Sequence, residues 1–127
     1  MFFNSNGNVG NIQTSGTATS YITSSDPRLK DFLEKPSDAR INEKFNSIYE
    51  SFELFNWKAD ESKSEVWGFN AHTAIDLDTG IGFEGGDRDK ELGDNVNPAG
   101  VDQSKAVPVL VAKIEQLERR LKLVENK

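Results

Sequence analysis

Residues 102–126 read DQSKAVPVLVAKIEQLERRLKLVEN, and the apolar residues in this stretch recur at alternating steps of three and four. This spacing fills the a and d positions of three heptads and predicts a C-terminal coiled-coil helix over about residues 102–126. Asp102 is the expected N-cap, and Pro108 is expected to bend or delay the first turns. The a and d residues, called the seam below, are Val107, Leu110, Ile114, Leu117, Leu121 and Val124.

Charges of opposite sign flank the seam. With a at 107, Lys113 and Arg120 fall at g, and Glu118 and Glu125 fall at e. Each g residue and the e residue five positions later would meet across chains in a parallel coiled coil, so the pattern favours self-association. The mixture of Val, Ile and Leu at a and d leaves dimer and trimer open. The alternative is a helix that packs on its own domain, because more apolar residues widen the face: Val109, Val111 and Ala112.

The other end of the chain has a different composition. The first 25 residues carry no charged side chain, and residues 17–23 predict a β-strand, since Thr, Tyr and Ile favour strands. Such a segment cannot bury enough apolar surface alone, so it is either disordered or one strand of an intertwined multi-chain stem. We therefore expect residues 1–24 to end a β-stem and residues 25–127 to form a separate domain.

Helix signals follow this boundary. Asp26 before Pro27 predicts a helix that ends near Lys35, because Pro36 disfavours α geometry in the residue before it. Ser37 is the predicted cap of a second helix, and residues 71–77 predict a short third helix capped by Asn70. The second helix has an apolar stripe that consists of Ile41, Phe45, Ile48 and Phe52.

The central region contains strands and a long loop. Residues 52–57 and 66–69 predict a β-hairpin joined by a charged turn. Residues 78–100 are rich in Gly, Asp and Asn, and they form either an arm that reaches a neighbouring subunit or a disordered excursion. The predicted fold is therefore α+β: a mainly helical domain with a small β-hairpin, a long extended loop arm and the coiled-coil helix, preceded by a β-stem strand.

Composition excludes several functions. The chain has 127 residues and a formal net charge of -6, and this acidity argues against a nucleic-acid partner. It contains no cysteine, which excludes a disulfide framework and a thiolate metal site. No apolar run approaches membrane-spanning length, and no signal-peptide pattern is present. Ile81 stands where an EF-hand loop needs glycine, so Asp76, Asp78 and Glu84 are not expected to bind calcium. We predict no metal and no cofactor; the single histidine, His72, more often has a structural role.

A serine and a lysine lie at the start of the first predicted helix. With Asp26 as N-cap, Ser25 and Lys30 occupy the two positions that pack together in a hydrophobic staple, which brings a hydroxyl beside an amine. Such a dyad works if the lysine is neutral, and the helix dipole and Arg28 would both lower the lysine pKa. Free amides of the first turn would stabilise an oxyanion formed at the bond between Ser24 and Ser25. On spacing alone, a capping turn is the more common role of such a serine.

Residues 25–30, SDPRLK, resemble the opening of the intramolecular chaperone domain of endosialidase-type phage tailspikes, where the motif is Ser-Asp-x-Arg-Leu-Lys. The chain is also similar to the C-terminal domains of related phage tail fibres and neck appendage proteins. Three more features agree in order: an aromatic strand at 52–57, a Gly-Phe-x-Ala element at 68–71, and a closing apolar helix at 107–124. The resemblance covers about residues 22–127.

The resemblance implies a homotrimer that holds three chains in register and helps its own upstream β-stem, a triple β-helix, to fold. It implies a serine peptidase that acts once, in cis, with Ser25 as nucleophile and Lys30 as general base, supported by Asp26 and Arg28. Cleavage would fall between Ser24 and Ser25, in the host cytoplasm during phage assembly, so that the domain is absent from the mature virion. The loop arm would grip the stem. A non-enzymatic trimerisation or capping module and a receptor-binding fibre tip are the alternatives.

Overall fold

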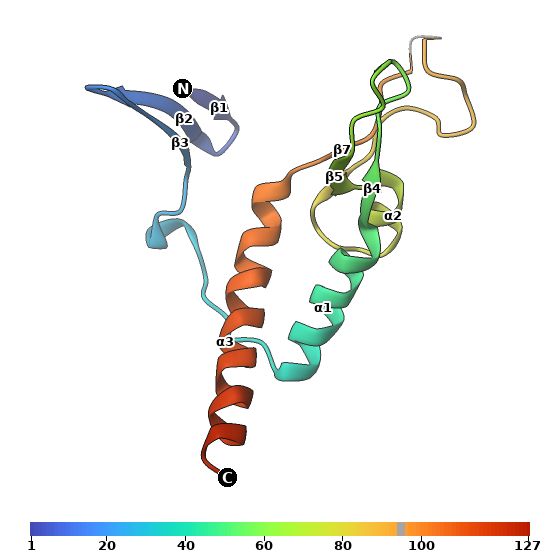
Figure 1. Ribbon diagram of the computed structural model, residues 1–127. Coiled ribbons are helices and arrows are strands. Elements are labelled where there is room, and N and C mark those ends of the chain that lie inside the picture. The colour runs from blue at the N-terminus through green and yellow to red at the C-terminus, as the bar shows by residue number, and fades with distance from the viewer. Residues whose placement is uncertain (94–95) are drawn as a thin grey trace. The chain divides into compact units, whose positions relative to one another are not determined.

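The computed structural model describes residues 1–93 and 96–127 and divides into two compact units, Met1–Lys35 and Pro36–Lys127 (Figure 1). Within the described residues, α-helices occur together with small antiparallel sheets. The predicted α+β class is therefore confirmed.

The first unit is an antiparallel meander whose strands are β1 (Phe2–Asn4), β2 (Gly7–Ser15) and β3 (Ala18–Thr23). Residues 10–15 of β2 pair with residues 18–23 of β3, and Gly16 takes a φ of 58° in the tight turn between them. β3 confirms the strand predicted at 17–23. None of residues 1–35, all of which are described, is buried, and even Phe3 and Tyr21 are exposed. The sheet has no core of its own within one chain.

The helix predicted after Asp26 is wrong beyond its first turn. Only a 3₁₀ turn forms, η1 (Pro27–Leu29), and Lys30 leaves it with extended backbone at φ -131° and ψ 145°. Phe32 and Leu33 are exposed, so no tertiary surface supports a longer helix. A helix this short is unstable without such packing, because the cost of nucleation is spread over too few hydrogen bonds.

The second unit begins with the helix predicted from its serine cap. Ser37 Oγ accepts a hydrogen bond from Arg40 N at 3.2 Å, and α1 (Asp38–Ser51) follows. Ile41 and Ile48 of the predicted apolar stripe are buried. The predicted second helix is therefore confirmed, including the residue that caps it.

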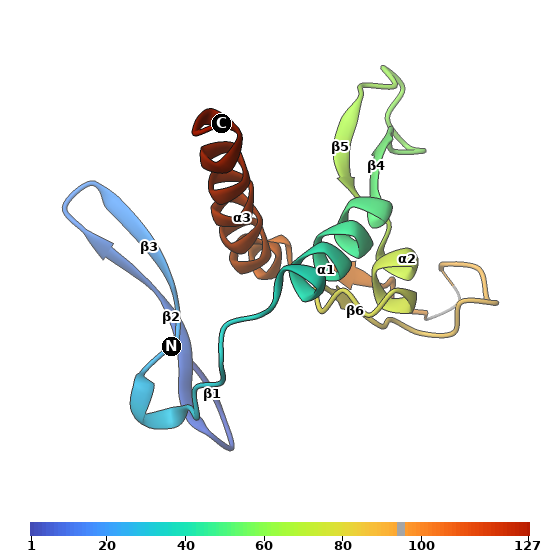
Figure 2. The same cartoon turned by 90° about the horizontal axis from the view of Figure 1, so that it is seen from below.

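The predicted hairpin and third helix are also confirmed. β4 (Phe52–Phe55) pairs antiparallel with β5 (Val66–Phe69), and the hairpin extends beyond the C-terminal end of α1 (Figure 2). α2 (Ala71–Asp76) then begins after Asn70, whose side chain accepts a hydrogen bond from Thr73 N at 3.2 Å. The chain thus reverses direction twice between residues 52 and 76.

The core of the second unit includes part of the segment predicted as a polar loop. Thr79 and Ile81 are buried, and the strands β6 (Gly82–Phe83) and β7 (Gly100–Val101) pair at the base of the loop. Ile81 O also accepts a hydrogen bond from Asp102 N at 2.7 Å. The core cluster is Ile48, Ala74, Ile81 and Ala106, with Phe69, Val101 and Val109 packed against it.

The two sides of the loop lie close together above this base. Gly86 N donates a hydrogen bond to Asn97 O at 2.7 Å, and a Cβ atom on Gly85 would overlap that same carbonyl oxygen. The described part of the predicted arm is thus closed at its base by the β6–β7 pair and by the contact of Gly86 with Asn97, and residues 94–95 lie outside the described residues. Its predicted contact with a neighbouring subunit stays a prediction.

Gly82→Ala should destabilise the second unit by about 1–3 kcal/mol, because the added methyl is forced into a packed core. A Cβ at this position would lie 2.8 Å from Ile75 Cγ1 and 3.2 Å from Ala71 O. Gly100→Ala, in the paired strand, is the control, since nothing lies within 4 Å of its added Cβ. Urea unfolding followed by tryptophan fluorescence should separate the two variants; equal midpoints would contradict close packing around Gly82.

The C-terminal helix begins as the sequence predicts. Asp102 Oδ1 accepts a hydrogen bond from Ser104 N at 3.1 Å and caps η2 (Gln103–Ala106). α3 (Val107–Glu125) follows, with Pro108 in its first turn. The cap therefore starts a 3₁₀ turn, and the α-helix proper is delayed to Val107.

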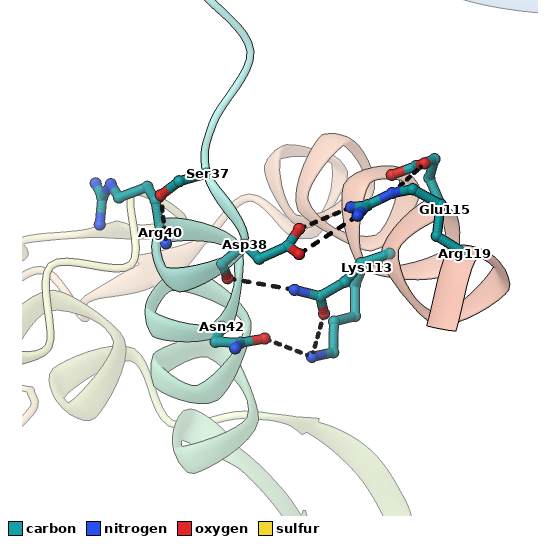
Figure 3. A network of polar contacts seen from close by, with 8 residues as sticks. Ser37, Asp38, Arg40, Asn42, Lys113, Glu115 and Arg119 are labelled. Carbon is teal, nitrogen blue, oxygen red and sulfur yellow. Dashed lines mark hydrogen bonds and ion pairs between the residues drawn. The ribbon is translucent and has the colours of Figure 1, made fainter. Parts of the chain in front are cut away.

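Polar side chains join α3 to α1 (Figure 3). Gln116 is only 1% exposed; its Nε2 donates to Asp38 O at 3.2 Å, and its Oε1 accepts from Lys113 Nζ at 2.8 Å. Lys113 Nζ also donates to Asn42 Oδ1 at 2.9 Å, and Arg119 pairs with the Asp38 carboxylate at 2.7 Å. Arg119 lowers the pKa of Asp38 below 3.8, so this ion pair stabilises the fold above that pH and is lost as the pH falls through the lowered value.

Gln116→Ala should lower the free energy of unfolding of the second unit by about 1–3 kcal/mol, because it removes a buried amide and leaves its part-buried partners without these hydrogen bonds. The partners are the Asp38 carbonyl and the Lys113 ammonium group. Gln103→Ala removes the same amide from an exposed position and should change stability little. Urea denaturation of both variants tests this, and an equal effect would show that the network between α1 and α3 is not stabilising.

Candidate functional site

The predicted serine and lysine lie side by side at the end of β3. Ser24 N donates to Val9 O at 2.9 Å, which extends the β2–β3 pairing up to the residue before the predicted nucleophile. The η1 turn then reverses the chain, and Lys30 Nζ donates to Ser25 Oγ at 2.5 Å. The structure therefore brings together the two side chains that the spacing of five predicted to meet.

Asp26 fixes the turn that makes this contact possible. Its carboxylate accepts hydrogen bonds from Arg28 N at 2.9 Å, from Arg28 Nε at 3.0 Å and from Arg28 Nη2 at 2.7 Å. The side-chain bond from Arg28 lowers the pKa of Asp26, and the same bond raises the pKa of Arg28. Asp26 thus acts both as the cap of η1 and as the ion partner of its second residue.

The reasons predicted for the dyad's reactivity are wrong in this turn. Ser25 and Lys30 do not form a staple on an α-helix, since a three-residue 3₁₀ turn replaces the helix and provides almost no macrodipole. Arg28 faces Asp26, which neutralises its charge. The amides of Arg28, Leu29 and Lys30 already donate within the turn. An oxyanion formed at Ser24 therefore needs donors from outside η1.

The dyad lies at the edge of a surface hollow of about 480 Å³ within the first unit. Ser25 and Lys30 are exposed, whereas Ser24 is half-buried. The hollow is lined by residues of the β1–β2 turn, β2 and η1, including Asn6, Val9 and Leu29. The bond between Ser24 and Ser25 is therefore accessible to solvent at a site shaped by both ends of the meander.

Two acidic residues of the rejected calcium motif form ion pairs, and His72 lies elsewhere. Arg88 pairs with Asp76 at 2.9 Å and with Glu84 at 3.0 Å, and its hydrogen bond lowers the pKa of Asp76. His72 lines a separate hollow that also includes Arg88. Among residues 1–93 and 96–127, no three or more His, Cys, Asp or Glu side chains gather as a metal site would require. No helix in that same part of the chain combines the length and apolar character needed to cross a membrane.

The predicted seam of α3 is exposed along its length. Its side chains range from 41% exposed at Leu110 to 65% at Ile114 and Val124. α3 does pack on α1, as the alternative interpretation expected, but it does so through Val109, Ala112, Lys113 and Gln116. At about 100° per residue, that face is turned by roughly 120° from the seam. One chain therefore leaves the heptad stripe free for another partner.

An aromatic groove beside the seam is a feature that the sequence did not predict. It has a volume of about 470 Å³ and lies between α1, the β4–β5 hairpin and the first turns of α3. Its lining includes Phe45, Tyr49, Phe52, Trp67 and Leu110. Phe45 and Phe52 belonged to the predicted core stripe, but the position of the hairpin over that stripe is a tertiary feature.

Comparison with known proteins gives no match to a family model, a curated protein or a solved structure. Two features of this chain therefore point to its function, namely the contact between Ser25 and Lys30 and the exposed apolar surfaces of the second unit.

Proposed function

We propose that this chain is a C-terminal intramolecular chaperone of a phage tail spike, fibre or appendage, which trimerises, assists its upstream β-stem and then cuts itself between Ser24 and Ser25. The observation that carries this proposal is the 2.5 Å contact of Lys30 Nζ with Ser25 Oγ, at the end of a β-strand. The assignment to phage fibres comes from the resemblance of residues 25–30 to the family motif.

The proposed reaction uses these two side chains and water, with oxyanion donors supplied from outside η1. Lys30, as the neutral amine, takes the proton of Ser25 Oγ while that oxygen attacks the Ser24 carbonyl carbon. The C–N bond breaks, the proton passes to Ser25 N, and an ester joins Ser24 to Ser25 Oγ. Water then hydrolyses the ester, which leaves a carboxylate on Ser24 and restores the Ser25 hydroxyl. The products are the stem with a new C-terminus and a released domain with a new N-terminus.

The surface of the single chain supports self-association, which we propose to be trimeric. The accessible area is 10538 Å², whereas two compact units of these lengths would expose about 8,000 Å². The excess includes the seam of α3 and the apolar side chains of the meander. Three copies joined through α3 would raise the effective concentration of their N-terminal strands, which assists the slow, non-local pairing of an intertwined stem. The client in this proposal is the chain's own upstream β-stem.

The decisive experiment is intact-mass measurement of the chain expressed with upstream stem sequence. We expect the folded protein to give two masses, one for a fragment that ends at Ser24 and one for a fragment that begins at Ser25. A single intact species, in protein shown to be folded and trimeric, would exclude the self-cleavage.

A second candidate, a trimerisation or capping module without enzymatic activity, is favoured by the exposure of the seam, which does not depend on the dyad. In that case Ser25 is only a turn residue, and the 24–25 bond stays intact in assembled protein. The same mass measurement distinguishes the two candidates.

Asp26→Ala should slow cleavage by about fivefold, because losing an N-cap costs about 1 kcal/mol and fewer molecules then hold the turn. Asp26→Asn keeps a good cap and loses only the charge, so it should cleave faster than the alanine variant. The fraction of uncut chain over time, by intact mass, measures both rates. If the two variants cleave at the same rate, capping by Asp26 is not what positions Lys30.

A further inference from the structure

The aromatic groove is too apolar to be an ordinary exposed surface. Tyr49 and Trp67 are 66% and 67% exposed, and Trp67 packs edge-on against Phe52 with ring centroids 5.7 Å apart. Leu110 belongs to both the groove and the seam. The groove is therefore continuous with the surface that the proposed trimer buries, and a partner on the seam would also reach it.

The position of α1 decides which neighbour can reach the groove. α1 packs against heptad positions c, f and g of α3, represented by Val109, Ala112 and Lys113. The groove therefore lies on the g side of the seam. In a parallel coiled coil, the g side of one helix faces the e side of the next. The neighbouring residue that meets the groove should consequently come from an e position near the level of Leu110.

Val111 is that residue. It occupies the first e position, where the later heptads carry Glu118 and Glu125, and it is 63% exposed within its own chain. The first g position holds Ala106, which is 5% exposed in the core. The charged g–e pairing of the later heptads is thus replaced here by apolar groups, as expected where an e residue enters an apolar groove.

We propose that this groove receives Val111 of a neighbouring copy of the chain, so that each chain in the ring fills the next one's groove. The inference rests on the proposed parallel homotrimer and assigns a role to surfaces outside the coiled-coil seam. At the level of Val111, apolar burial between chains takes the place of a g–e ion pair, because the g position is Ala106 and the e position is Val111.

Crosslinking between different chains tests the proposal, since the natural sequence contains no cysteine. One batch of protein carries Tyr49→Cys and the other carries Val111→Cys; the two are unfolded together, refolded and treated with a short bismaleimide. Any dimer containing one chain of each kind must have formed between copies. Leu123→Cys replaces Val111→Cys in the control, because Leu123 is also exposed, at 68%, but lies at a c position.

The expected result is at least about tenfold more mixed dimer with Val111→Cys than with Leu123→Cys, because only held neighbours react at high effective concentration. Sedimentation equilibrium on the same mixtures separates the possible failures. Trimers without preferential crosslinking would overturn the groove assignment and leave the proposed trimer in place. Monomers alone would overturn both.

Discussion

Lys30→Met is expected to slow cleavage by about 10²–10⁴-fold, which is the usual contribution of a general base. Ser25→Ala should stop cleavage altogether, because no oxygen remains to attack the Ser24 carbonyl. Lys30 Nζ contacts Ser25 Oγ at 2.5 Å, so both substitutions act on one pair of atoms. The measurement is intact mass against time for the chain expressed with its stem.

The chain offers a matched control for each substitution. Ser24→Ala removes the neighbouring hydroxyl, and Lys35→Met removes an exposed lysine from the same unit. Both controls should cleave at close to the normal rate, since neither side chain belongs to the dyad. Cleavage of the Ser25→Ala variant at the same bond would show that Ser25 is not the nucleophile. Cleavage of the Lys30→Met variant at the normal rate would show that Lys30 is not the base.

Local signals in the sequence predicted most of the second unit. Ser37 and Asn70 cap helices because their side chains accept hydrogen bonds from amides three residues away, and such contacts need no tertiary partner. The Ser25–Lys30 contact was predictable for the same reason, since one tight turn is enough to bring the two side chains together. The helix dipole predicted beside the dyad is absent. A helix there would need tertiary packing, which Phe32 and Leu33 lack in one chain.

Tertiary context decided the features that the sequence did not predict. Ile81 is buried although it lies in a glycine-rich polar stretch, because the β6–β7 pair draws that stretch into the core. Gln116 is buried at a position where the heptad pattern predicts a solvent-facing residue, because α1 packs on that side of α3. A periodic pattern shows that a helix has an apolar stripe, but it does not show which of its faces the chain itself covers.

Leu117→Asp is expected to convert the proposed trimer into monomers. Leu117 occupies a d position and is 49% exposed in one chain, so the assembly, not the monomer, would bury it. Loss of a buried leucine costs at least about 2 kcal/mol per chain, or about 6 kcal/mol for three chains, before any charge repulsion. That is about four orders of magnitude in the trimerisation constant. Sedimentation equilibrium at several concentrations measures the shift.

Leu123→Asp is the control that makes this test specific. Leu123 is also an exposed leucine of α3, two residues after the seam position Leu121 and outside the a and d stripe. Leu123→Asp should leave the proposed trimer intact. Neither substitution touches the contacts of Asp38 with Gln116 and Arg119, so circular dichroism should show an unchanged helix content in both variants. Equal dissociation by the two variants would mean that general surface charge, not the seam, controls association.

The same pair of variants tests whether trimerisation drives folding of the stem. If the C-terminal helices bring the three N-terminal strands together, Leu117→Asp should slow or prevent stem folding even though it lies outside the meander. Protease resistance of the stem in newly expressed protein reports this directly. Normal stem folding in monomeric Leu117→Asp protein would show that the stem folds without association. Loss of stem folding in Leu117→Asp but not in Leu123→Asp would show that stem folding requires association.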